Sequence, residues 1–138
     1  MNDIIKLIPF HLLKKSLTTP EDLRKIANSL GFSIDYIGFG YNFLQVKDVC
    51  KLCILNIGND LIGGTHWVAV NNETKEYFDS LGAPPPDYIP NNYKHNNHNG
   101  IQHMKWGHCG QYCVLWLYYS NKGKSNDFFK LFKKGYYE

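Results

Sequence analysis

The feature that most constrains the fold is the segment 112–119, which is apolar on every side and carries no charge. A helix of about two turns or more without a polar face packs in the centre of a small domain rather than on its surface. The polar, glycine-bearing stretch before it ends at Cys109 and Gly110, so we expect Cys109 in the first turn of this helix. Unpaired backbone N–H groups and the helix dipole favour a thiolate there. The sequence therefore predicts a buried central helix that begins at a cysteine nucleophile.

The rest of the chain predicts a single α+β domain over residues 1–138, because a helix is followed by strands and then by helices. We expect a mixed, mostly antiparallel sheet that packs on the central helix. We expect strands over residues 32–36, 52–57, 65–70 and 75–80 and a last helix over 127–134. Residues 82–86 contain three prolines and cannot form helix or central strand, and the polar stretch 91–100 is predicted to be a surface loop.

Capping signals delimit the first helix. Thr19 suits the N-cap, Pro20 the first helical position, and Glu21 and Asp22 place acids in the first turn. Gly31 follows the apolar stripe and is expected to end the helix.

Charge and hydropathy argue against a membrane protein. No window approaches about 20 apolar residues, and the net charge of +3 is mild. The apolar run 4–10 lacks a basic flank and a small-residue cleavage site, so we expect no signal peptide and no secretion. The four cysteines are then expected to be reduced thiols.

His66 and Asp79 flank a predicted β-hairpin. If residues 71–74 form a four-residue loop, Val70 pairs with Lys75, and His66 lies directly opposite Asp79. Opposed residues have Cβ atoms about 4.5–5.5 Å apart, so the imidazole and the carboxylate can form a hydrogen bond. A register change of one residue would place them on opposite faces, whereas a change of two would keep them on the same face.

The stretch before the central helix can supply groups that stabilise an oxyanion. The backbone N–H of Cys109 can be one donor, and the side-chain amide of Gln102 a second. Gly107 and Gly110 allow a substrate and the backbone to come close to the thiol.

These pieces, in this order, resemble the adenovirus-type (adenain-like) maturation proteases and the wider ubiquitin-like-protein proteases. The matching segments are residues 64–67, 77–82 and 109–113 together with Gln102, which lies seven residues before Cys109 as in the adenovirus-type enzymes. The run FDSLGAPPP at 78–86, with the helix and strand expected before it, is similar to proteases encoded by Polinton/Maverick elements, virophages and related DNA viruses.

The resemblance implies a cysteine-protease domain in which each matching residue has a role. It implies Cys109 as nucleophile, His66 as general base and acid, Asp79 as the group that orients the imidazole, and Gln102 as oxyanion donor. It implies neither a metal nor a cofactor.

The resemblance also implies a substrate class. Trp67 is expected to pack near the site, and Gly107 and Gly110 to line it. Such enzymes cleave after glycine at Gly-X-Gly or Gly-Gly sites, so capsid precursors in the virion or the infected host cell are the expected substrates. An activating peptide or DNA stays open as a further partner.

Two other interpretations remain open. The same fold can remove ubiquitin or SUMO-type modifiers as an isopeptidase. In a different class, Cys50 and Cys53 have metal-ligand spacing and could join Cys109, Cys113 or His108 in a zinc-binding module.

Overall fold

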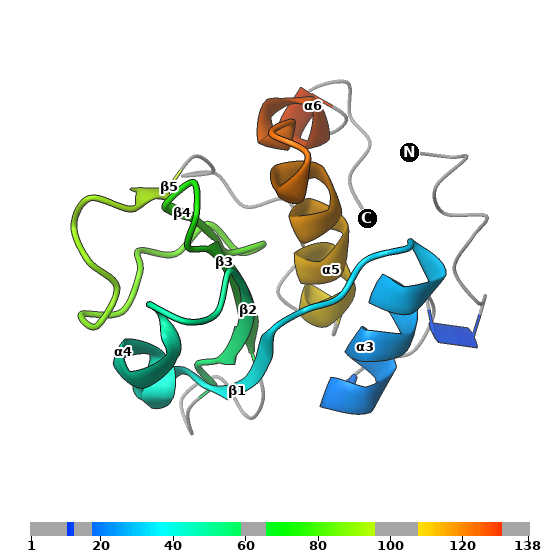
Figure 1. Ribbon diagram of the computed structural model, residues 1–138, viewed down its shortest axis with the longest axis horizontal. Helices are drawn as coiled ribbons and strands as arrows, with labels where there is room; N and C mark the ends of the chain where they lie inside the picture. The colour runs from blue at the N-terminus through cyan, green and yellow to red at the C-terminus, as the bar shows by residue number, and fades with distance from the viewer. Residues whose placement is uncertain (1–10, 13–17, 59–65, 96–107, 131–138) are drawn as a thin grey trace.

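The computed structural model describes residues 11–12, 18–58, 66–95 and 108–130. Five strands form one mixed sheet in the order β1-β2-β3-β4-β5, with helices packed around it (Figure 1). The strands are β1 Tyr36–Phe39, β2 Leu52–Asn56, β3 Trp67–Asn71, β4 Glu76–Phe78 and β5 Lys94–His95. The helices are α3 Pro20–Ser29, η1 Gly40–Asn42, α4 Phe43–Val46, α5 Cys109–Asn121 and α6 Ser125–Lys130. The predicted α+β class is confirmed.

The sheet is less antiparallel than predicted. Strand β3 pairs antiparallel with β2 and β4, but β1 runs parallel to β2 and β5 parallel to β4. The mixed sheet is therefore as predicted, but among the described residues only two of its four strand pairings are antiparallel. Strand β5 lies inside the stretch expected to be a loop, and its two polar residues, Lys94 and His95, carry no alternating pattern that could reveal it.

Both faces of the sheet are covered, which explains the nearly continuous apolar runs of β2 and β3. Helices α3 and α5 lie on one side and α4 on the other (Figure 1). Alternation within β2 sends Ile54 into the core with α3 and α5, and Cys53 into the core with Phe43 of α4. Strand β3 alternates in the same way: Ala69 lies in the core with α3 and α5, and Val68 lies in the core with Phe43.

Helix α3 forms where its caps predict. The Thr19 hydroxyl accepts a hydrogen bond from the Asp22 N–H at 3.1 Å, and the Asp22 carboxylate accepts one from the Thr19 N–H at 2.9 Å. Gly31 follows the helix with a φ of +83°, a conformation that glycine adopts without strain.

The first strand begins later than predicted. The Asp35 carboxylate accepts hydrogen bonds from the backbone N–H groups of Lys51 and Leu52, at 3.0 and 2.9 Å. Residues 32–35 therefore form no strand, and pairing with β2 begins at Tyr36.

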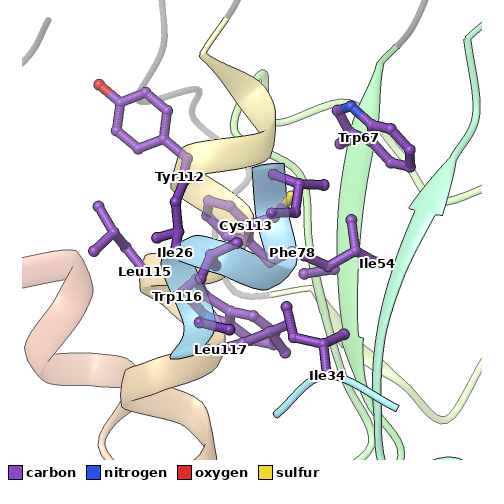
Figure 2. Close-up of a cluster of buried hydrophobic side chains, with 14 of the residues drawn as sticks. Ile26, Ile34, Ile54, Trp67, Phe78, Tyr112, Cys113, Leu115, Trp116 and Leu117 are labelled. Carbon is purple, nitrogen blue, oxygen red and sulfur yellow. The ribbon is translucent and has the colours of Figure 1, made fainter. Parts of the chain in front are cut away.

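Helix α5 is the buried centre of the domain, and it begins at Cys109 as predicted. Its side chains pack on α3 and on the sheet, and the Trp116 ring stacks on the Phe78 ring at a centroid distance of 5.3 Å. Figure 2 shows this core, where Tyr112, Cys113 and Leu117 of α5 lie among residues from α3, β2, β3 and β4. Within the described part of the chain, no helix has both the length and the apolar character that a membrane span requires.

Helix α6 starts at Ser125, two residues before the predicted start at Asp127. Residues 131–134, the rest of the predicted helix, lie outside the described residues.

Candidate active site

The β3–β4 hairpin brings His66 and Asp79 into contact. His66 directly precedes β3 and Asp79 directly follows β4, and both side chains are buried. His66 Nε2 lies 2.8 Å from Asp79 Oδ1, a short hydrogen bond between an imidazole and a carboxylate. The predicted pair is therefore present.

The register that produces this pair differs from the predicted one by two residues. Val70 pairs with Tyr77 rather than with Lys75, so His66 is not directly opposite Asp79. A shift of two conserves the face on which each side chain lies. The two groups approach along the diagonal of the hairpin instead of straight across it.

Asn71 explains the shift. It belongs to β3 instead of the turn, and its side-chain oxygen accepts hydrogen bonds from the N–H groups of Glu73 and Thr74 at 3.0 and 3.2 Å. The four residues that connect the two strands are therefore 72–75 instead of the predicted 71–74. Lys75 ends the turn with a φ of +55°.

A turn of the backbone fixes the Asp79 carboxylate. The Leu81 N–H donates to Asp79 Oδ1 at 2.8 Å, the same oxygen that faces His66. Gly82 closes the turn, since its N–H donates to the Asp79 carbonyl and its φ is +74°. Two donors on one oxygen hold the carboxylate in the orientation that the imidazole requires.

Cys109 completes the constellation from the first turn of α5. The Trp67 backbone N–H donates to Cys109 Sγ at 3.4 Å, and the Cys109 side chain is close enough to His66 to raise the pKa of the imidazole. Donors on sulfur stabilise a thiolate more than a thiol. The Trp67 contact could not be predicted from the sequence, because it depends on how β3 packs against α5.

The pKa of His66 shows which charge state this environment favours. Burial acts to lower it, but the hydrogen bond to Asp79, the nearby Cys109 side chain and the charge of Asp79 raise the pKa to about 9. At neutral pH the favoured state is therefore an imidazolium between a carboxylate and a sulfur atom. In general, a positively charged imidazole beside a cysteine sulfur favours the thiolate form of that cysteine.

Cys113 lies one helical turn beyond Cys109 and deeper in the same core, with 0 % of its surface exposed against 6 % for Cys109. The side chain is fully buried in the core. Burial, followed by the charges of Cys109 and Asp79, raises the pKa of Cys113 well above its usual value. Cys113 is therefore an inert core thiol, as its position on the helix predicts.

Gly110 has a packing role in the described structure. A Cβ atom there would collide with Thr18 Oγ1, would lie 2.7 Å from Leu23 Cδ2, and would lie 3.3 Å from Trp67 Cδ1. The missing side chain thus lets α3 and the Trp67 indole approach the first turn of α5. Whether Gly110 or Trp67 also contacts a substrate stays a prediction.

Replacing Gly110 with Ala should therefore destabilise the protein, even though alanine is the better helix former. Overpacking of a filled core costs about 1–3 kcal/mol, and we expect a loss of this size in the free energy of unfolding measured with urea. The matched control is Asn121→Ala, at an exposed position of the same helix, which should change stability by no more than about 0.5 kcal/mol. Equal stability of the two variants would contradict the packing role.

Two predicted site residues, Gln102 and Gly107, lie outside the described residues. The second oxyanion donor and one predicted substrate contact therefore stay predictions.

The structure separates the cysteines that a zinc module would need. Cys53 lies in the core on the α4 side of the sheet and Cys50 packs against that core, whereas Cys109 and Cys113 lie in the core around α5. Burial, with smaller contributions from Cys50 and Asp35, raises the pKa of Cys53 to about 12, which disfavours the thiolate that zinc requires. Among the described residues, no group of three metal-ligating side chains converges. The hypothesis of one zinc site shared by both cysteine pairs is wrong.

Comparisons of the chain with protein-family models, with curated proteins and with solved structures give no match.

Proposed function

We propose that this chain is a cysteine endopeptidase that cleaves after glycine. The observation that carries the proposal is the set of contacts around Cys109. Its sulfur accepts a hydrogen bond from the Trp67 N–H at 3.4 Å and lies close enough to His66 to raise the pKa of the imidazole, whose Nε2 in turn lies 2.8 Å from the Asp79 carboxylate. Nucleophile, base and orienting acid are the three groups that thiol peptidases need. The resemblance to adenain-like proteases supports capsid precursors as substrates, in the virion or the infected host cell.

The geometry suggests how the proton moves. Because His66 Nε2 faces Asp79, Nδ1 is the ring nitrogen that exchanges a proton with the Cys109 sulfur. The thiolate attacks the carbonyl carbon of the substrate glycine and forms a tetrahedral intermediate. The imidazolium then gives its proton to the leaving amine as the C–N bond breaks. Water, deprotonated by the neutral imidazole, hydrolyses the resulting thioester and regenerates the thiolate.

The start of α5 provides a donor for the oxyanion. The Cys109 N–H lies at the helix N-terminus, where backbone N–H groups lack partners within the helix. The N-cap residue, His108, makes no side-chain hydrogen bond to the first turn. Gln102 remains the proposed second donor. Removing a donor of this kind typically raises the barrier by about 2.7–4 kcal/mol.

A panel of paired peptides tests the proposal. The purified chain should cleave peptides that contain Gly-X-Gly and Gly-Gly after the glycine, and mass spectrometry should locate the bond. The matched peptides, with the glycine before the cleaved bond replaced by alanine, should stay intact. We expect activity to persist in the presence of EDTA. Ubiquitin-like fusions and co-expressed capsid precursors in the same panel separate modifier removal from precursor processing. The proposal fails if no member of the panel is cut and Cys109 alkylates no faster than an ordinary thiol.

A further inference from the structure

Hydrogen bonds join helix α5 to strand β3 at both ends of the strand. At the start of β3, the Trp67 N–H donates to Cys109 Sγ at 3.4 Å. At the end of β3, the Asn71 side-chain amide donates to Ser120 Oγ at 2.9 Å. The two contacts show that the helix and the strand run alongside each other in the same direction, as Figure 1 also shows. The second contact lies far from the candidate site, and the proposed chemistry does not use it.

A buried carboxylate extends this distal contact. Glu76 is the first residue of β4 and pairs with Asn71. Its Oε1 accepts a hydrogen bond from the Ser120 hydroxyl at 2.9 Å and one from the Thr74 hydroxyl at 2.7 Å. Its Oε2 accepts one from the Ser125 hydroxyl at 2.6 Å. One carboxylate thus joins α5, α6 and the hairpin turn.

The direction of these bonds is fixed. Ser120 Oγ accepts from the Asn71 amide, so its single proton goes to Glu76. Bonds to a charged carboxylate are short and directional, whereas the apolar contacts of α5 lack a preferred direction. The Ser120 contact can therefore fix the position of α5 along its own axis, which the core packing fixes less sharply.

Strand β4 links this contact to the candidate site. Glu76 begins the strand and Asp79 follows its last residue, so only two residues lie between them, and three steps of extended chain span about 10 Å. The hairpin thus holds the imidazole through Asp79 and the nucleophile helix through Glu76. We propose that the Glu76–Ser120 hydrogen bond is a positioning contact that sets the distance of Cys109 from His66. This inference rests on the proposed peptidase function.

Two serine substitutions separate positioning from stability. Ser120→Ala and Ser125→Ala each remove one hydroxyl from the same carboxylate, but only Ser120 lies on the nucleophile helix. Small displacements of reacting groups are costly, so we expect Ser120→Ala to lower kcat on the order of ten-fold, with little change in KM. It should also shift the pH profile of Cys109 alkylation by iodoacetamide, followed by peptide mass spectrometry. Ser125→Ala should lower stability yet keep both properties within about two-fold of the wild type.

Substitutions of Glu76 give a second test that does not depend on the serines. Glu76→Gln keeps the length of the side chain and one acceptor oxygen, whereas Glu76→Asp keeps the charge but shortens the reach by one methylene. If the length of the side chain at position 76 determines the position of helix α5, the Gln variant should retain more of the wild-type kcat and alkylation profile than the Asp variant. Equal effects of the two serine variants on catalysis and alkylation, or better retention by Asp than by Gln, would overturn the proposal.

The alkylation measurement also separates this proposal from the proposed function. If the wild-type protein cuts no peptide but Cys109 reacts as a thiolate below neutral pH, the serine and Glu76 variants still decide the positioning role. If the wild type cuts no peptide and Cys109 also shows the profile of an ordinary thiol, the peptidase proposal fails, and the positioning proposal fails with it.

Discussion

Replacing Cys109 with alanine is expected to abolish peptide cleavage. The sulfur is the atom that forms the covalent bond to the substrate in the proposed mechanism, and no neighbouring group can replace it. Cys113, the nearest cysteine along the helix, is fully buried and has a pKa well above its usual value. Cleavage rates with a Gly-Gly peptide should fall to the uncatalysed background, and the rapid iodoacetamide reaction of the wild type should disappear.

Cys113→Ala is the matched control, because it removes a thiol from the same helix one turn away. A modest loss of stability is expected from the small cavity that it leaves, with cleavage and alkylation retained. Cleavage by the Cys109→Ala protein would contradict the thiol mechanism. Loss of activity only in Cys113→Ala would identify Cys113 as the nucleophile instead.

Replacing His66 with alanine should lower kcat/KM on the order of 10²–10⁴-fold, the range that one general acid–base group contributes. The imidazole both accepts the thiol proton and protonates the leaving amine, so its loss affects two steps. Steady-state kinetics with the same peptide measure the effect. A loss of only a few-fold would mean that another group is the base.

Asp79→Asn tests the same pair through its pH dependence. The pKa of His66 is raised in the folded protein, from 6.5 to about 9. The contribution of the protonated His66 side chain to stability is therefore complete below about pH 6.5 and is lost as the pH rises through about 9. Urea unfolding across this range should show the wild type losing stability as the pH rises, whereas Asp79→Asn should show a flatter dependence. An unchanged slope in the variant would contradict the assigned role of Asp79.

The parts of the fold that the sequence predicts well are those with local signals. Helix α3 carries its own N-cap in Thr19 and its own stop in Gly31. Helix α5 lacks a polar face, which by itself requires burial. Strand β5 could not be predicted, because Lys94 and His95 form a strand only by pairing with β4.

The candidate site was predictable for a different reason. The distance of His66 from Asp79 depends on the face of the hairpin on which each lies, and the true register shifts them by two residues without changing that face. The sulfur contact of Trp67 and the close packing at Gly110 depend on residues far apart in the sequence. Single-sequence patterns carry no signal for such contacts.

The unequal environments of the four cysteines have a practical consequence for chemical probes. Cys53 and Cys113 are buried in separate cores and hold their protons tightly, so mild electrophiles discriminate against both. Cys50 is partly exposed and is the one competitor of Cys109 for a reagent. A Cys50→Ser background would therefore allow a fluorescent reporter or a trapped substrate mimic to be attached to the nucleophile alone, without any redesign of the interior.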